Sequence, residues 1–162
     1  MHSARALPVL LGTAAIVVGV DQATKEIAVR SLSDGPVDLI EGILTLRLTF
    51  NAGGAFGLLQ GQPRLFLVAS LVIAIVILLW ARNLEHRSWA LPLGLILGGG
   101  LGNVADRLFR PYRGHVVDFV DLHVWPVFNV ADSAIVAGVC VLFWLSARAE
   151  RPAAEQAGAG SR

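Results

Sequence analysis

The stretch LFLVASLVIAIVILLW, residues 65–80, decides the fold class of this chain. Ser70 is its only polar side chain, and an apolar run approaching the ~20 residues that cross a bilayer is typical of a transmembrane helix. The whole chain agrees, with 55% hydrophobic residues, 15% charged residues and a mean hydropathy of +0.65. These values exclude an ordinary soluble domain, and the net charge of +1 provides no basic field for nucleic acid.

Three more apolar segments accompany this one, at about residues 6–28, 89–105 and 130–147. We therefore predict a mainly α membrane protein, a four-transmembrane-helix bundle in which residues 1–147 form a single domain. The first segment could instead be a cleaved signal peptide, but no Ala-x-Ala site follows it, so we expect a retained helix. The third segment is rich in glycine, which predicts close approach of neighbouring helices.

A small extracytoplasmic β-sheet is predicted between the first two spans, at about residues 37–57. Leucine or phenylalanine alternates with threonine or arginine through residues 44–50, and this period of two is typical of a half-buried strand. The stretch NAGGAFG, residues 51–57, can then form tight turns. At the other end of the chain, residues 148–162 have little to bury and are expected to form a disordered cytoplasmic tail.

Arginine and tryptophan indicate the orientation in the membrane. An even number of spans places both termini on one side. Arginine is denser in the termini and in residues 81–88 than in the other two loops, which favours a cytoplasmic location for both termini. Trp80, Trp89 and Trp144 then all lie at the inner interface, as an aromatic belt does. The other two loops, which carry most of the polar motifs, are then on the outer side.

Two aspartates flank the last span. An ionised carboxylate at the edge of a bilayer core costs roughly 2.5–3.5 kcal/mol on insertion scales, so both need a reason to be there. Asp132 has a structural explanation, because Asn129 could cap the helix and an acid in the first turn suits the helix dipole. Asp118 is surrounded by apolar residues and is predicted either to pair with Arg107 or Arg113 or to have a raised pKa. Brought together by the loop between them, the two carboxylates could share one proton and activate water against a peptide bond.

Asn103, Asp106 and Arg107 lie on one face at the end of the third span. One interpretation is a solvated helix end with a local ion pair. The other depends on the nearby aspartates, beside which Arg107 could bind a substrate carbonyl or a lipid ester while Asn103 holds backbone. The residues alone leave both open.

Two further pairs of polar residues remain, one with two possible roles and one without a predicted metal site. Asp21 and Lys25 are spaced i,i+4 on the first helix and either tie it to its neighbours or serve the site. His115 and His123 share a loop but have no cysteine and no second carboxylate–histidine spacing beside them, so we predict no metal site.

Five motifs together give the chain a family resemblance. They are DQATK (21–25), NAGGAFG (51–57), GGLGNVADR (99–107), GHVVDF (114–119) and FNVADS (128–133). In their order and their four-span setting, the chain resembles the lipoprotein signal peptidases, also called signal peptidase II, over roughly residues 7–147. The loop 109–113, whose length varies in the family, and the tail from Arg148 depart from the pattern without affecting the motifs.

The resemblance implies an aspartic endopeptidase of the bacterial cytoplasmic membrane, with its active site near the outer surface and no metal or other cofactor. Its substrates would be prolipoproteins whose lipobox cysteine already carries diacylglycerol, and it would cut just before that cysteine. Asp118 and Asp132 match the family's catalytic pair. The other matches are the substrate-site residues Asn51, Asn103, Arg107 and Asn129 and the supporting residues Asp21, Lys25 and Asp106. We expect a monomer whose partners are these substrates and membrane lipid.

Other kinds of protein are weighed against the peptidase. A small transporter or channel could use Asp21, Asp118 and Asp132 as a proton or cation path, but no charge lies deep in the second or fourth helix. Paired broken helices, which transporters use, are not evident either. A non-catalytic membrane adaptor would have no use for five polar motifs at one membrane face. An unrelated intramembrane aspartic protease would place both aspartates in mid-helix, whereas Asp118 is predicted in a loop.

Overall fold

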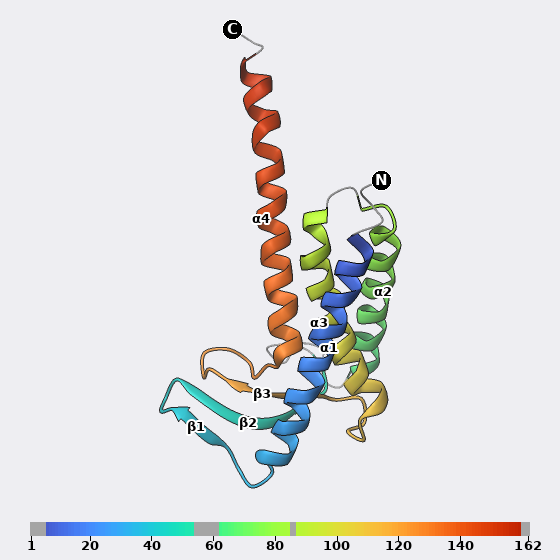
Figure 1. Ribbon diagram of the computed structural model, residues 1–162. Helices are drawn as coiled ribbons and strands as arrows, with labels where there is room; N and C mark the ends of the chain where they lie inside the picture. The colour runs from blue at the N-terminus through green and yellow to red at the C-terminus, as the bar shows by residue number, and fades with distance from the viewer. Residues whose placement is uncertain (1–5, 54–61, 85–86, 160–162) are drawn as a thin grey trace.

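The computed structural model describes residues 6–53, 62–84 and 87–159, with side chains as far as Arg148. Four described helices are long and apolar enough to cross a membrane, which confirms the predicted bundle. They are α1 Ala6–Ser31, α2 Pro63–Ala81, α3 Ala90–Phe109 and α4 Val130–Ala159 (Figure 1). A 3₁₀ turn, η3 Arg87–Trp89, leads into α3. Residues 54–57, the end of the predicted turn, lie outside the described residues.

Helix α4 is longer than the sequence pattern predicted. The apolar run ends near Ala147, and the following residues were expected to be disordered because they have little to bury. In the structure α4 continues to Ala159, so the expected tail is helical as far as that residue. Alanine, glutamate, glutamine and arginine in residues 148–159 all have a high helix propensity, which Pro152 and Gly158 only partly oppose. The projecting end of α4 is visible in Figure 1.

Helix α3 is the centre of the bundle and contacts each of the other three helices. Within the most apolar 18 residues of each span, 56% of the residues are buried in the third span, against 28% in α1 and 17% in both α2 and α4. Glycine permits this close packing. A Cβ on Gly98 would lie 2.8 Å from the carbonyl oxygen of Ala14 in α1, and one on Gly99 would collide with the carbonyl oxygen of Ala131 in α4. The prediction of close helix approach is therefore confirmed.

A three-stranded antiparallel sheet lies at one end of the bundle (Figure 1). Its strands, in spatial order, are β1 Val37–Ile40, β2 Leu44–Asn51 and β3 Val116–Asp121. The sequence pattern predicted β2 but placed the third strand in a loop. Nearly all of β3 is buried on both faces. Its sequence, VVDFVD, therefore does not show the alternation of apolar and polar residues by which a half-buried strand is recognised. Pairing of Thr49 with Asp118 brings this strand against β2.

The alternation within β2 is less regular than the sequence suggests. Leu44, Leu46 and Leu48 are half-buried and Arg47 is exposed, as expected, but Thr45 is buried. Its hydroxyl donates to Asp38 of β1 and contacts Nε2 of His123, so the burial of this polar group is compensated by hydrogen bonds.

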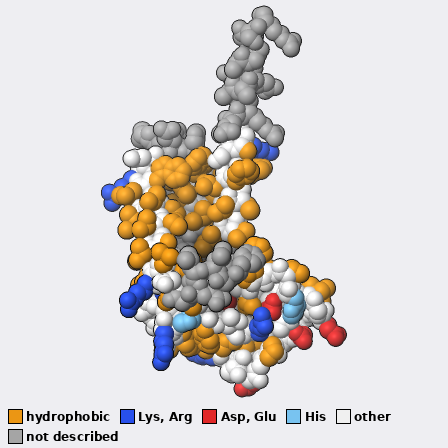
Figure 2. Space-filling model, turned by 180° about the vertical axis from the view of Figure 1, so that it is seen from behind, with side chains coloured by type: hydrophobic (Ala, Val, Ile, Leu, Met, Phe, Trp, Pro, Cys, Tyr) orange, Lys and Arg blue, Asp and Glu red, His pale blue; other side chains and the backbone are white. Residues whose placement is uncertain are grey.

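Two apolar clusters stabilise the molecule. The larger one lies between α1, α2 and α3, toward the end away from the sheet, and includes Leu10, Ile77 and Leu97. The smaller one packs the end of α1 against the sheet through Leu32 and Phe119. On the face shown in Figure 2, hydrophobic side chains cover the helical part, whereas charged side chains gather at its borders and around the sheet. This distribution suits a helical part in lipid and a sheet at the aqueous boundary.

Both ends of the bundle's chain lie away from the sheet. Helix α1 begins and α4 ends at the side opposite the three strands (Figure 1). The rings of Trp80 and Trp89 contact each other with centroids 5.2 Å apart, and the Arg148 guanidinium lies 4.1 Å from the centroid of the Trp144 ring. The three predicted interface tryptophans therefore sit on elements that reach this side, which is what an aromatic belt there requires.

Candidate active site

Asp132 lies in the first turn of α4, where it forms a reciprocal cap with Asn129. The Asp132 backbone N–H donates to Asn129 Oδ1 at 2.9 Å, and the Asn129 backbone N–H donates to Asp132 Oδ2 at 3.2 Å. This capping box satisfies two backbone donors at the helix start, so the structural interpretation of Asp132 is correct. It occupies only one carboxylate oxygen. The other, Oδ1, accepts from Asn103 Nδ2 at 2.9 Å.

Asp118 lies on β3 and is only 1% exposed. Its Oδ1 accepts a 2.6 Å hydrogen bond from the side-chain amide of Asn129, and its Oδ2 accepts one of 2.9 Å from that of Asn51. Two neutral amides thus hold the carboxylate. Among the described residues, neither Arg107 nor Arg113 forms an ion pair with it.

The environment of Asp118 changes its ionisation. Burial raises the pKa of this carboxyl most strongly, and the negative charge of Asp132 raises it further. The hydrogen bonds from Asn51 and Asn129 favour the ionised form, but they are outweighed, and the pKa reaches about 7. Of the two alternatives for Asp118, a partner cation or a raised pKa, the structure shows the second.

Asn129 joins the two aspartates. It is completely buried, and its side chain uses Nδ2 toward Asp118 and Oδ1 toward the backbone of Asp132. The same Nδ2 also lies 3.1 Å from Asn103 Oδ1. The Asn129 side chain therefore links the carboxylate of Asp118 on β3 to the backbone of Asp132 on α4, and the Asn129 backbone N–H contacts the Asp132 carboxylate.

Asn103 and Arg107, one turn apart on α3, border the same space. Arg107 Nη1 donates to the carbonyl oxygen of Asn103 at 3.2 Å, and its Cζ lies 5.9 Å from the centroid of the Phe66 ring of α2. Its Nε is buried and has no hydrogen-bond acceptor among the described residues. A buried donor without an acceptor is rare in a folded protein, which distinguishes Arg107 from the other buried polar side chains of the described residues.

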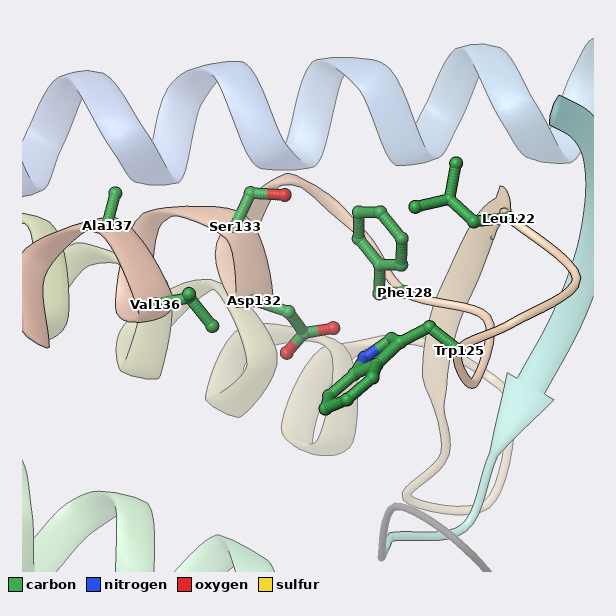
Figure 3. A pocket seen from close by; sticks show the side chains of 7 residues that line it. All are labelled: Leu122, Trp125, Phe128, Asp132, Ser133, Val136 and Ala137. Atoms are coloured by element: carbon green, nitrogen blue, oxygen red, sulfur yellow. The ribbon is translucent and has the colours of Figure 1, made fainter. Parts of the chain in front are cut away.

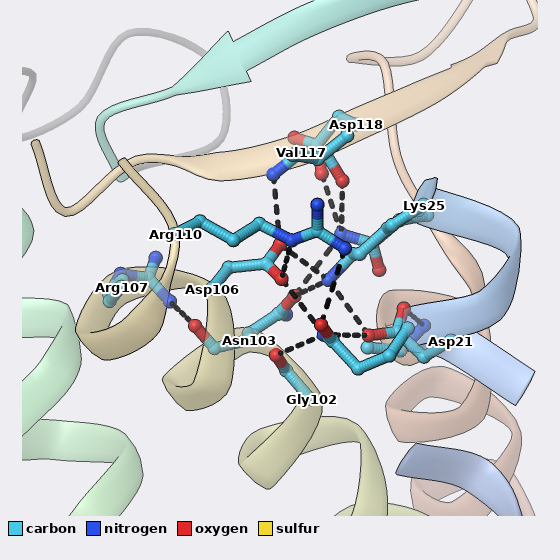
Figure 4. Close-up of polar contacts among 12 residues, drawn as sticks. Asp21, Lys25, Gly102, Asn103, Asp106, Arg107, Arg110, Val117 and Asp118 are labelled. Carbon is cyan, nitrogen blue, oxygen red and sulfur yellow. Dashed lines mark hydrogen bonds and ion pairs between the residues drawn. The ribbon is translucent and has the colours of Figure 1, made fainter. Parts of the chain in front are cut away.

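Asp21, Lys25 and Asp106 form a buried ion cluster behind Asn103 (Figure 4). The Lys25 ammonium lies 2.9 Å from Asp21 Oδ2, 2.9 Å from Asp106 Oδ2 and 3.0 Å from Asn103 Oδ1. All nine residues singled out in the sequence, Asp21, Lys25, Asn51, Asn103, Asp106, Arg107, Asp118, Asn129 and Asp132, thus belong to one hydrogen-bonded network.

The sequence reasoning missed two members of this network. Gln22 Nε2 donates to Asp106 Oδ1 at 2.8 Å, and Arg110 Nε donates to the same oxygen at 3.0 Å. Signals for both existed. Gln22 lies inside the DQATK motif, and Arg110 follows Asp106 by four residues, the spacing of a helical ion pair.

Two cavities meet at Asp132. One, of about 420 Å³, is mostly apolar and lies along α4 beneath Trp125 and Phe128. Figure 3 shows the Asp132 carboxylate directed into this space, toward the Trp125 indole. The other, of about 310 Å³, lies between α2, α3, α4 and the end of β2, and its polar wall includes Asn51, Asn103 and Arg107. An apolar and a polar cavity therefore share one carboxylate as a wall.

Comparisons with known proteins agree on one family. The model of the family described as Signal peptidase (SPase) II matches residues 13–148. A lipoprotein signal peptidase of Mycolicibacterium smegmatis is 45% identical over 146 residues, which are 88% of this chain and 62% of that protein. One of Rhodococcus jostii is 44% identical, with 90% of this chain and 74% of that protein covered. A solved bacterial membrane enzyme, 27% identical, superposes with a TM-score of 0.78 over 88% of this chain and 89% of its own.

Proposed function

The chain belongs to the signal peptidase II family of aspartic peptidases, and from this we propose that it removes the signal peptide from diacylglyceryl-modified bacterial prolipoproteins, cutting just before the lipid-bearing cysteine. One observation of the site carries the proposal. The buried amide of Asn129 links Asp118 to Asp132, and the pKa of Asp118 is raised to about 7. Helix capping accounts for one oxygen of Asp132, whereas the buried carboxyl of Asp118 lies on a strand and caps no helix.

The two carboxylates have different roles in the proposed reaction. Asp118, whose pKa is raised to about 7, is partly protonated at neutral pH and in its protonated form serves as the general acid. Asp132, which lines both cavities, is the ionised partner and serves as the general base. In this proposal the form of the pair that carries a single proton is the active one.

The reaction then proceeds in two balanced steps. Asp132 takes a proton from water, whose oxygen forms a bond to the scissile carbonyl carbon, while Asp118 gives its proton to the carbonyl oxygen. The product is a tetrahedral diol. In the second step the carbon–nitrogen bond breaks, Asp132 returns its proton to the leaving nitrogen, and a diol hydroxyl reprotonates Asp118. The free carboxylic acid and the amine are released, and the pair is restored.

The cavity walls suit the two parts of the proposed substrate. Arg107, with its unpaired buried Nε, and the amides of Asn51 and Asn103 can hold carbonyl groups of the peptide in the polar cavity. The apolar cavity along α4 is open to acyl chains or to the signal-peptide helix. Much of the binding energy would then come from apolar contact, which tolerates different sequences. Strand β2 lies where it can clamp the peptide from above.

The proposed location follows from the same features. We place both termini in the cytoplasm, on the arginine density and the three tryptophans, and the sheet with the aspartate pair near the outer membrane surface. There the site meets a substrate anchored in the bilayer by its acyl chains and its signal peptide. The working unit in this proposal is a monomer in contact with lipid, because both aspartates belong to one chain.

A cleavage assay in detergent tests the proposal. The substrate is a precursor with a diacylglyceryl cysteine, and the same precursor without lipid is the substrate control. We expect Asp118→Asn and Asp132→Asn each to lower kcat by roughly 10²–10⁴-fold, because each removes one proton-transfer group. Thermal stability should change little, since asparagine can still accept the Asn129 N–H at position 132 and no longer buries a charge at 118.

The matched control is Asp34→Asn, which removes an exposed carboxylate from the loop after α1. It should keep wild-type kcat. Wild-type turnover by Asp132→Asn would mean that Asp132 is only a helix cap, and the proposed pair would be wrong.

A further inference from the structure

We propose that Lys25 is a positioning residue that holds Asp118 and Asp132 in register, by fixing the backbone directly before each of them. This inference rests on the proposed function, since it concerns the same pair of aspartates. Lys25 lies on α1, which contributes neither aspartate of the pair, and its ammonium contacts Asp21, Asp106 and Asn103 instead of the two carboxylates. It acts through the groups that it binds (Figure 4).

Each carboxylate that binds Lys25 also accepts one backbone N–H. Asp21 Oδ1 accepts from the N–H of Ala131 at 2.9 Å, and Ala131 immediately precedes Asp132. Asp106 Oδ2 accepts from the N–H of Val117 at 3.0 Å, and Val117 immediately precedes Asp118. One buried cation thus holds two carboxylates, and each of them fixes the chain one residue before one member of the pair.

The third contact of Lys25 sets the orientation of an amide. An ammonium only donates, so it must face the carbonyl oxygen of Asn103, which it contacts at 3.0 Å. The Asn103 amide nitrogen is then turned toward Asp132 Oδ1, to which it donates at 2.9 Å. A flipped amide would place two donors against each other at Lys25 and two oxygens against each other at Asp132. Lys25 therefore selects the orientation that supports the carboxylate.

The cluster is completely buried and its charges are paired. Lys25, Asp21 and Asp106 are all 0% exposed, and the three contacts of Lys25 match the three protons of its ammonium. Buried charges that lost their partners would be strongly destabilising, so these groups stay paired. The backbone also closes around them, because a Cβ on Gly102 would lie 2.6 Å from Asp21 Oδ2.

A purely structural role would be to tie α1 to the end of α3, and a neighbouring ion pair outside the cluster is a matched example of that role. Glu26, next to Lys25 on α1, pairs with Arg110 at 3.3 Å and with Arg30 at 2.8 Å. Its side chain is half-exposed and has no contact with the backbone before either aspartate. Loss of Glu26 removes ion pairs beside the cluster while leaving the hydrogen bonds to Ala131 and Val117 in place.

The experiment compares kcat, KM and Tm of the full chain in detergent on the diacylglyceryl-modified precursor. Lys25→Met keeps the apolar stem and removes the charge. We expect kcat to fall roughly 10–100-fold with KM within about twofold, because a displaced catalytic group costs turnover more than binding. The positive charge of Lys25 also lowers the pKa of Asp118, so its removal should move the alkaline limb of the kcat/KM profile to higher pH.

Three companion variants separate positioning from stability. Glu26→Gln should keep wild-type kcat. Leu10→Ala opens the apolar cluster far from the site and should lower Tm while the folded fraction keeps wild-type kcat. Lys25→Met with Asp21→Asn restores the net charge of the cluster, so it should recover Tm but not kcat.

Each outcome decides the matter. Low kcat with a shifted alkaline limb in the folded Lys25→Met or double variant supports positioning. Wild-type kcat in either folded variant overturns the proposal. A decrease in kcat that is no larger than the decrease in Leu10→Ala at the same Tm overturns it as well. Failure of both variants to fold would make Lys25 a folding residue and would overturn it as well. If the folded wild-type chain does not cleave the precursor, the proposed function itself fails. This outcome is distinct from every result of the variants, because it concerns the unmodified chain.

Discussion

Replacing Asn129 by serine separates the two tasks of this side chain. Serine caps helices about as well as asparagine, so its hydroxyl can still accept the Asp132 N–H. It has no amide donor at the position from which Asn129 Nδ2 reaches Asp118 Oδ1 at 2.6 Å. Asn129→Ser therefore removes the link between the two aspartates and retains the helix cap. Asn129→Ala, the matched comparison, removes both.

The structure gives the expected magnitudes. A buried hydrogen bond to a charged group contributes about 1.5–3 kcal/mol, and this one favours the ionised form of Asp118. At about 1.4 kcal/mol per pH unit, its loss should raise the pKa of Asp118, which starts at about 7, by roughly one to two pH units. As general acid, Asp118 is active while protonated, and activity falls as pH rises through its pKa. The alkaline limb of kcat/KM should therefore move upward by the same one to two units.

Rates and stability are measured on the same samples. Initial rates of precursor cleavage between pH 5 and 10 give the position of the alkaline limb, and thermal unfolding in the same detergent gives the stability. Asn129→Ser and Asn129→Ala should share the shifted limb and a reduced kcat. Asn129→Ala should be the less stable of the two by about 1 kcal/mol, the usual contribution of an N-cap.

A wild-type alkaline limb in Asn129→Ser would refute this reasoning, because the amide would then have no influence on the proton of Asp118. A limb that shifts only in Asn129→Ala would be equally damaging. It would attribute the effect to the start of α4 and not to the link between the aspartates.

Two other predictions concern the substrate site and the orientation. Arg107→Lys keeps the charge but loses the planar fork of donors. The transition-state stabilisation calculated from kcat/KM should therefore fall by about 1–3 kcal/mol. An unchanged kcat/KM would mean that Arg107 is an ordinary charge at a helix end. In a Cys140→Ala background, Asp34→Cys should react with an impermeant thiol reagent added to intact cells, and Asn83→Cys should not. The reverse pattern would place the aspartates on the cytoplasmic side of the membrane and contradict the proposed orientation.

The helices were predictable because each has a strong local signal. An apolar run such as residues 65–80 predicts a transmembrane span, and the glycines of α3 predict close packing against neighbouring helices. Strand β2 was predictable from its period of two. Strand β3 was not, because burial of nearly every residue removes the alternation by which a strand is recognised. The end of α4 was missed for a different reason, since residues 148–159 contain no large aliphatic or aromatic side chain whose spacing could predict a helix.

The members of the site were identified by their motifs, but their contacts were not. Asn129 and Asp132 are three residues apart, so the capping box could be predicted from spacing alone. The contact of Lys25 with Asn103 joins residues 78 positions apart, and only the packing of α1 against α3 creates it. For Asp118, sequence reasoning left a partner cation and a raised pKa as alternatives. The choice depends on the full set of neighbours around a buried strand, and no local pattern contains that information.

The placement of the two aspartates on different kinds of element has a consequence for biogenesis. Asp132 is carried by a helix that can enter the bilayer alone, whereas Asp118 is carried by a strand that is held by pairing with β2. A chain with all four helices inserted but the sheet not yet docked would contain only half of the pair. Proteolytic competence would therefore arise only when the sheet docks on the inserted helices, and an immature molecule would be harmless to neighbouring membrane proteins.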